Sequence, residues 1–176
     1  MTSIVLSWSE IVTAAGVGVL RHVSALRNTM RQVNGADPDD WTIDIDGALA
    51  ELAVAKHLQL PWDMFAPLGA FNRPDVGPYQ VKANGRARRN AAHDDLIVKE
   101  SDPIGDPYIS VLNFPPRFEI CGWIAGVEAK NKRYWCDRLA PGRDAYLVPR
   151  ADLKSLETLP HLRSTPNQRK ETTWNF

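Results

Sequence analysis

The hydrophobic period of the chain changes once, near Pro61, and this change restricts the folds that the chain can adopt. Before Pro61 the apolar residues recur at helical spacing, whereas after it they alternate in short runs. The capping box Ser7-Trp8-Ser9-Glu10 predicts the start of a first helix that continues to about Val33. The second apolar stretch predicts a helix over residues 43–60, which Pro61 ends.

Alternating runs predict six strands in the second part of the chain. They cover residues 62–66, 79–83, 96–99, 108–114, 118–124 and 145–148. Pro115-Pro116 predicts a bend, rather than a tight two-residue hairpin, between the fourth and fifth of these strands. A short helix is expected over residues 151–156. Two helices, a run of strands and a final helix are typical of an α+β fold.

A length of 176 residues suits one compact domain. We expect this domain over residues 1–159, with a helical N-terminal part (1–40) and a core (41–159), followed by a polar tail (160–176). With 21 basic and 21 acidic residues the net charge is zero, which argues against a protein that coats nucleic acid by bulk electrostatics. The chain shows neither a long apolar run nor a signal peptide, which favours a cytoplasmic protein without membrane contact.

One carboxylate of the second predicted helix, that of Glu51, lies on the face that should pack against the sheet. Its helical neighbours at spacings of three, four and seven are Ala48, Ala55 and Leu58. Burial of an unpaired carboxylate is costly, so Glu51 needs a cation or hydrogen-bond donors. Two interpretations are open: a ligand of a metal ion or water, or a boundary residue that pairs with a lysine or reaches solvent.

A turn followed by a strand gathers three more polar side chains. Residues 74–78 form a predicted turn that places Asp75 at the mouth of the strand 79–83. Because side chains two apart in a strand point to the same face, Gln80 and Lys82 should project together. An acid, an amide oxygen and an ammonium group are a set that metal-dependent phosphodiester hydrolysis uses. A turn aspartate before an amphipathic strand with a solvated polar face explains the same pattern without function.

The order of these residues resembles the active site of the PD-(D/E)XK nuclease superfamily. Glu51 on a helix, then Pro74-Asp75, then Gln80-Val81-Lys82 match the family's helix glutamate, its aspartate and its (D/E)XK element in order. Gln80 departs from the pattern because it stands in place of the second acid. Some members carry glutamine there, and the chain is similar to small phage- and prophage-encoded members of this kind. The resemblance covers about residues 40–125.

The resemblance implies a restriction-endonuclease-like core, with a mixed central sheet flanked by helices and preceded by the N-terminal helices. It also implies a Mg²⁺-dependent deoxyribonuclease, with Mn²⁺ as a substitute and DNA as the partner. In such an enzyme Glu51, Asp75 and Gln80 hold the metal and Lys82 assists the attacking water. Pairing of two subunits is a further expectation. Because a neutral Gln80 should weaken metal binding, the alternative is a nuclease-fold module that binds nucleic acid or protein with little or no cleavage.

The resemblance leaves one architectural choice open. The family usually places a helix after the lysine strand and one further strand, whereas residues 101–125 predict strands here. The second core helix is therefore either displaced into residues 128–139 or replaced by an elaborated sheet.

Basic residues near the predicted site suggest contacts with nucleic acid. Arg86, Arg88 and Arg89 follow the lysine strand directly, and we predict that they hold the phosphate backbone near the metal. A solvated hairpin tip would have the same composition. A second candidate contact is Tyr134-Trp135, which lies in a segment with three basic residues: Lys130, Lys132 and Arg133.

Overall fold

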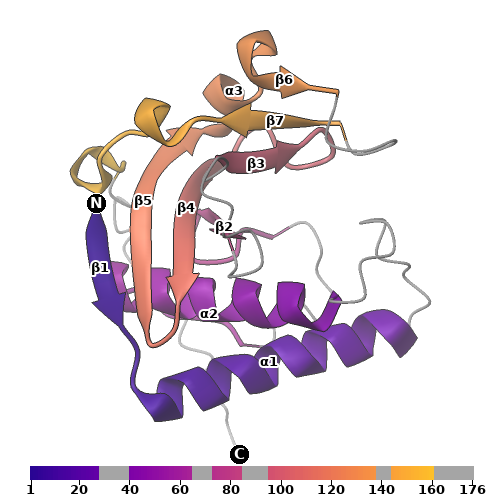
Figure 1. Ribbon diagram of the computed structural model, residues 1–176, viewed down its shortest axis with the longest axis vertical. Coiled ribbons are helices and arrows are strands. Elements are labelled where there is room, and N and C mark those ends of the chain that lie inside the picture. The colour runs from indigo at the N-terminus through magenta and orange to yellow at the C-terminus, as the bar shows by residue number, and fades with distance from the viewer. Residues whose placement is uncertain (28–39, 65–72, 85–94, 138–143, 161–176) are drawn as a thin grey trace, which may run out of the picture.

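The structure is a computed structural model that describes residues 1–27, 40–64, 73–84, 95–137 and 144–160 (Figure 1). Two long helices, α1 (Trp8–Arg27) and α2 (Asp40–Leu58), lie side by side at one end of the molecule. The strands are β1 (Thr2–Val5), β2 (Gln80–Asn84), β3 (Leu96–Lys99), β4 (Pro107–Phe114), β5 (Arg117–Ala125), β6 (Trp135–Cys136) and β7 (Ala145–Val148). Short helical turns are α3 (Gly126–Ala129), η3 (Lys132–Tyr134), η4 (Arg150–Asp152) and η5 (Leu156–Thr158).

The strands form two sheets. The larger sheet has the order β1-β5-β4-β2, in which β2 and β4 are parallel and the other pairs are antiparallel. The smaller sheet is antiparallel, with the order β3-β7-β6. Figure 1 shows the larger sheet between the two long helices and the smaller sheet. The α+β class and a mixed sheet are therefore confirmed, and β2 is an edge strand of the larger sheet.

Each face of the larger sheet packs on its own hydrophobic core. Toward the helices, Val54 of α2 packs with Val81 and Ile109 of the sheet. On the opposite face, Tyr108 packs with Leu96 and other residues of the smaller sheet. Since alternate residues of a strand face opposite sides, Gln80 and Lys82 of β2 lie on the side away from α2.

The two long helices approach closely at Gly18. A Cβ atom at this glycine would lie 2.6 Å from the Cα atom of Ile45, so only glycine permits this spacing. Next to this contact, His22 Nδ1 lies 2.8 Å from Asp44 Oδ2, and the His22 ring packs on Trp41 with 4.1 Å between ring centroids. Glycine is costly in the interior of a helix, and here that cost is offset by close helix packing.

The predicted helix boundaries are confirmed in part. The capping box is present: the Ser7 N–H donates to Glu10 Oε2 (2.6 Å) and the Glu10 N–H donates to Ser7 Oγ (3.3 Å). Residues 28–33 of the predicted first helix lie outside the described residues. The second helix ends two residues before its predicted end, because Gln59 adopts a left-handed φ of 55°.

Most of the predicted strands are confirmed, two of them with the predicted ends (β3 and β7). The strand predicted over 62–66 is wrong for residues 62–64, which form no ladder; residues 65 and 66 lie outside the described residues. β1 and β6 were not predicted. Residues 101–125 contain β4 and β5, and α3 is a single turn, so the described residues agree with an elaborated sheet rather than a displaced helix.

Two expectations about connections are also wrong. Phe114 pairs directly with Arg117, so Pro115-Pro116, joined by a cis peptide bond, forms a two-residue hairpin. Prolines are tolerated there because the two loop positions donate no hydrogen bond to the ladder. In place of the helix predicted over 151–156 there are two 3-10 turns, η4 and η5. They are separated where Lys154 forms a bridge with Trp123. No helix within the described ranges could span a membrane.

Candidate functional site

Asp75 lies in the predicted turn, beside the outermost strand of the larger sheet, β2. Its N–H donates to the Tyr79 carbonyl (2.9 Å), and the residue after it, Val76, pairs with Tyr79 across the turn. Gly77 has a φ of 56°, a left-handed conformation that glycine adopts readily. The Asp75 carboxylate accepts a hydrogen bond of 2.7 Å from the Val81 N–H. The turn therefore fixes this carboxylate beside the strand that carries Gln80 and Lys82.

Glu51 reaches this region from the helical side of the sheet. It is only 5% exposed, and Arg21 of α1 holds both of its oxygens through two hydrogen bonds of 2.6 Å. The indole N–H of Trp62 donates to Glu51 Oε2 at 3.0 Å. The prediction that Glu51 needs a cation or donors is confirmed. Arg21 was missed, because its place on the inner face of α1 becomes meaningful only when the α1–α2 packing is known.

Gln80 and Lys82 meet two aspartates on the other side of the sheet. Lys82 Nζ forms an ion pair of 2.7 Å with Asp102 Oδ2, and Gln80 Nε2 donates to Asp106 Oδ2 at 2.9 Å. The prediction that Gln80 and Lys82 project together is thus confirmed. Neither aspartate was predicted. The sequence does show an acidic stretch, residues 100–106, directly before β4. This stretch lies near Gln80 and Lys82 because β4 pairs in parallel with β2.

The segment 100–106 is held firmly in place. Lys130 Nζ donates to the carbonyls of Glu100 (2.6 Å) and Asp102 (2.5 Å). At Gly126 the backbone of this segment comes so close that a Cβ atom would lie 2.5 Å from the Ile104 carbonyl oxygen. Asp102 and Asp106 are therefore presented to β2 by a fixed backbone.

The pKa of Asp75 is affected by charged groups on both sides of the sheet. Its pKa is raised from 3.8 to about 7, first by burial and then by the negative charge of Glu51. The Val81 N–H, Lys82 and Arg21 oppose this rise. Near neutral pH this carboxyl group is therefore balanced between its protonated and its ionised form, and a nearby cation would favour the ionised form.

Tyr108 of β4 is the aromatic residue at the centre of the acidic side. Burial raises the pKa of its hydroxyl group, and the charges of Asp102, Asp106 and Asp75 raise it further. The hydroxyl group accordingly stays protonated and donates to the Pro103 carbonyl. Lys82 Nζ lies 5.6 Å from the centroid of the Tyr108 ring. Asp75 and the two unpredicted aspartates thus act on one region around Lys82.

Whether this site could hold a divalent metal ion depends on which side-chain oxygen atoms are available as ligands. Among the described residues, no three histidine, cysteine, aspartate or glutamate side chains converge as a ready metal site. Asp75 offers carboxylate oxygen, whereas both Glu51 oxygens are bound to Arg21. Because an ionised carboxylate only accepts hydrogen bonds, Asp106 must face the NH₂ end of the Gln80 amide, which leaves the amide oxygen for another partner. Mg²⁺ commonly uses few protein oxygens and keeps several waters, and the Asp75 carboxylate and the Gln80 amide oxygen are of the kinds that it uses.

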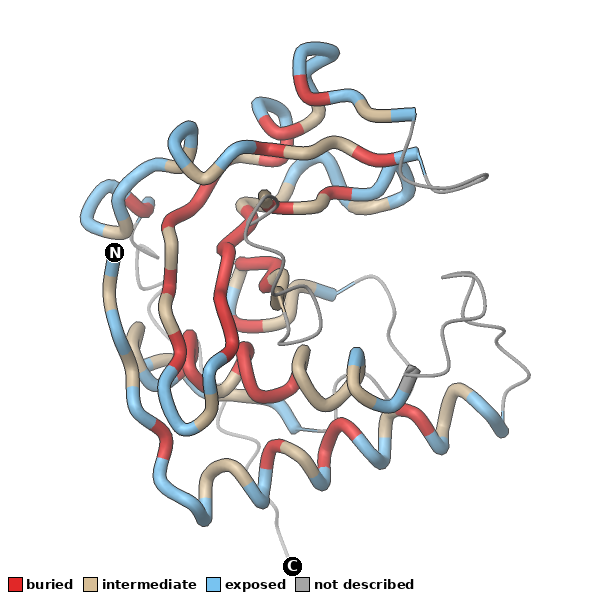
Figure 2. The backbone as a smooth tube through the Cα atoms, in the orientation of Figure 1, coloured by how far each residue is buried: buried red, intermediate tan, exposed pale blue. Residues whose placement is uncertain are grey.

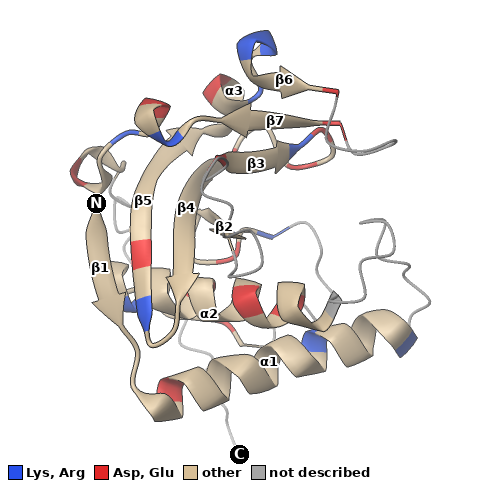
Figure 3. Ribbon diagram, in the orientation of Figure 1, with Lys and Arg blue, Asp and Glu red and all other residues tan. Residues whose placement is uncertain are grey.

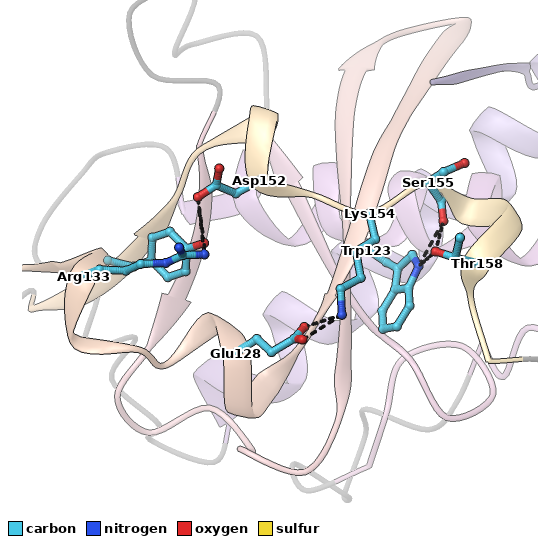
Figure 4. A network of polar contacts seen from close by, with 8 residues as sticks. Trp123, Glu128, Arg133, Asp152, Lys154, Ser155 and Thr158 are labelled. Atoms are coloured by element: carbon cyan, nitrogen blue, oxygen red, sulfur yellow. Dashed lines mark hydrogen bonds and ion pairs between the residues drawn. The ribbon is translucent and has the colours of Figure 1, made fainter.

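The basic residues predicted to contact nucleic acid have different outcomes. Arg86, Arg88 and Arg89 lie outside the described residues. In the second candidate region, Lys130 is turned toward the segment 100–106. Arg133 forms an ion pair with Asp152 (Figure 4) and contacts the Tyr134 hydroxyl group. These contacts weaken the case for a nucleic-acid surface there.

The comparisons with known proteins complete the description of the site. No family model, no curated protein and no solved structure matches the chain. The assignment of a function therefore depends on the chemistry of the described residues.

Proposed function

We propose that the chain is a Mg²⁺-dependent phosphodiesterase that hydrolyses DNA beside β2. The observation that carries the proposal is the position of Asp75. Asp75 is partly buried, its carboxyl group is near the charges of Glu51 and Lys82, and its pKa is raised to about 7. Glu51 is neutralised by Arg21, whereas the charge of the nearby Asp75 carboxylate is neutralised only in part, so Asp75 attracts a cation. A lysine beside it, Lys82, can stabilise the negative charge of a phosphate.

The proposed roles follow from the contacts of each residue. Asp75 and the Gln80 amide oxygen would hold the metal, with Glu51 as a third ligand if Arg21 releases one of its oxygens. When bound, the ion would polarise the phosphate and lower the pKa of a bound water. Lys82 would leave Asp102 to stabilise the developing charge and position the water. Asp106 is a positioning residue, because its hydrogen bond sets which end of the Gln80 amide faces the metal.

A second candidate function is supported by two features of the same residues. Gln80 carries no charge, and Arg21 occupies both oxygens of Glu51. A site in which Asp75 is the one carboxylate without a bound cation would bind a metal weakly. The chain would then be a nuclease-fold module that binds nucleic acid or protein without efficient cleavage.

The deciding experiment is a cleavage assay with linear duplex, supercoiled and single-stranded DNA in the presence of Mg²⁺, Mn²⁺ or EDTA. Asp75→Asn and Lys82→Met test the proposed site. Asp137→Asn and Lys154→Met are the matched controls, since Asp137 is exposed and Lys154, like Lys82, forms an ion pair with a carboxylate, here the exposed one of Glu128. Metal-dependent cleavage that only the first two variants lose, by at least about a hundredfold, would support the enzyme.

Binding data separate the two candidate functions. DNA binding without cleavage under every metal condition would contradict the enzyme and favour the binding module. Metal binding is measured separately, by the rise in melting temperature on addition of Mn²⁺. Asp75→Asn should abolish this rise, whereas Asp137→Asn should retain it.

A further inference from the structure

Lys82, the residue proposed to contact phosphate, already has an anionic partner. Its Nζ atom lies 2.7 Å from Asp102 Oδ2, and the side chains of the two residues are 27% and 17% exposed. A phosphate group that contacts this lysine must therefore replace a carboxylate, which carries charge of the same sign.

Asp102 does not depend on Lys82 for its position. Its N–H donates to the Lys99 carbonyl (3.1 Å), and the Lys99 N–H donates to Asp102 Oδ2 (2.9 Å). Lys130 Nζ also donates to the Asp102 carbonyl. The carboxylate therefore keeps its place and a hydrogen bond when Lys82 leaves, and it can take the lysine back.

Lys82 can exchange partners at low cost. A lysine ammonium group is a compact charge on a flexible four-carbon stem, so rotation about the side-chain bonds moves it between partners. Figure 2 shows the connection between β3 and β4, which carries Asp102, as mostly exposed, whereas β4 is mostly buried. Figure 3 shows acidic residues in the same connection. Water can solvate both charges of this partly exposed pair while it separates, which keeps the cost of separation small.

We propose that Asp102 competes with phosphate for Lys82 and thereby favours ligands that bind through several phosphates. A single phosphodiester gains little from Lys82, because the new ion pair only replaces the pair with Asp102. A nucleic-acid strand offers further phosphates to other basic groups, and the counterions that it releases favour binding. In the absence of a strand, Lys82 returns to Asp102.

The second aspartate of the segment 100–106 does not take part in this competition. Asp106 accepts a hydrogen bond from the neutral amide of Gln80, so its removal frees no cation. Among the described residues, the contacts assign the competition for Lys82 to Asp102.

The test measures binding in EDTA to a thymidine dinucleotide, which carries one phosphodiester group. Asp102→Asn should raise the affinity for this dinucleotide about three- to fivefold, because a partly exposed ion pair no longer competes. The gain should be smaller for a longer single strand, which binds largely through its other phosphates. NMR titration gives the first affinity and fluorescence anisotropy the second.

The variant is expected to fold, because the side-chain oxygen introduced at position 102 can still accept a hydrogen bond from the Lys99 N–H. Asp102→Ser is the second variant, since serine also accepts hydrogen bonds in turns. Melting temperatures check the fold of both variants.

Two controls show whether Asp102 acts through Lys82. In a Lys82→Met background, Asp102→Asn should leave the dinucleotide affinity unchanged, because no ammonium group remains to be released. Glu128→Gln removes the same charge and frees Lys154 from a pair of 2.6 Å, and it should not change the affinity either. An equal gain in either control would overturn the proposal, since loss of negative charge alone would then explain it. Failure of Asp102→Asn to raise the affinity, including a lack of detectable binding by wild type and variant, would overturn it too.

The inference rests on the proposed function for the contact between Lys82 and phosphate, but it concerns binding rather than cleavage. If Asp102→Asn binds the dinucleotide more tightly and the wild type cleaves no DNA with any metal, the enzyme is contradicted and the inference is retained. Metal-dependent cleavage together with an unchanged dinucleotide affinity would retain the enzyme and contradict the inference.

Discussion

The two sides of β2 hold their charged residues in different ways. On the helical side, Arg21 and Glu51 form a closed pair with two hydrogen bonds, and their side chains are 13% and 7% exposed. On the opposite side, Lys82 and Asp102 share one contact, and their side chains are 27% and 17% exposed. A buried pair leaves a costly charge behind when one partner is removed, whereas a more exposed pair exchanges partners easily. We infer that the first pair is mainly structural and that the second is free to respond to a ligand.

The largest expected effect is the loss of Arg21. Arg21→Ala should lower the free energy of unfolding by about 3–5 kcal/mol, because Glu51 would remain buried without its cation. Chemical denaturation measures the change. The double variant Arg21→Met/Glu51→Leu should recover most of the loss. Arg27→Ala, at the exposed end of the same helix, is the control and should change stability by less than about 0.5 kcal/mol. An equally small effect of Arg21→Ala would contradict the structural role.

The pH dependence of stability tests Asp75, which lies between the two sides. Its folded-state pKa of about 7 exceeds the ordinary value of 3.8, so the folded protein binds this proton more tightly than the unfolded chain. The resulting stabilisation is fully present below the lower value and is lost as the pH rises to the higher one. Relative to Asp75→Asn, the wild type should therefore lose up to about 1.4 kcal/mol per pH unit within this window. If the free energy of unfolding changed with pH in the same way for the two proteins across this window, a raised pKa of Asp75 would be excluded.

Disruption of the hydrogen bond between Gln80 and Asp106 should change the stability by an intermediate amount. Gln80→Glu would place two carboxylates at hydrogen-bond distance and should cost about 1–3 kcal/mol of stability. Adding Asp106→Asn should restore stability, because the new amide at position 106 can donate a hydrogen bond to the carboxylate introduced at position 80. A double-mutant cycle measured by thermal unfolding gives the coupling energy. If Asp106 also sets the orientation of the amide, Asp106→Ala should weaken Mn²⁺ binding more than it lowers the melting temperature of the metal-free protein.

The smallest effect on stability is expected at Lys82. Its ion pair with Asp102 is partly solvated, so Lys82→Met should cost less than about 1 kcal/mol. The same substitution should abolish DNA cleavage if the proposed function is correct. Unfolding curves and cleavage rates of one preparation separate the two effects. A large loss of stability would show that Lys82 is structural, like Arg21.

The sequence could predict those parts of the site that depend on local order. The turn before β2 follows from its proline and glycine residues, and the common direction of Gln80 and Lys82 follows from the strand period. The need of Glu51 for a partner follows from the face of its helix. Each of these predictions concerns residues that are close together in the chain.

The remaining parts depend on packing between distant segments. Asp106 meets Gln80 only because β2 and β4 are parallel neighbours, and nothing in either strand specifies this pairing. Arg21 meets Glu51 only because α1 turns the face that carries Ala14, Val17 and Gly18 toward α2, while large apolar residues such as Val12 and Leu20 remain exposed. Helical periodicity identifies a helix but does not say which of two faces is buried when both are apolar.

The position of β1 has a consequence for the order of events during synthesis. Thr2 pairs with Ile120, so the first strand cannot join its sheet until most of the domain has left the ribosome. The α1–α2 pair, including Arg21 and Glu51, can form much earlier, because the two helices are neighbours in the chain. A protein fused to the N-terminus would therefore remain beside an unpaired strand through most of translation, whereas the helix pair would already shield its own ion pair from water.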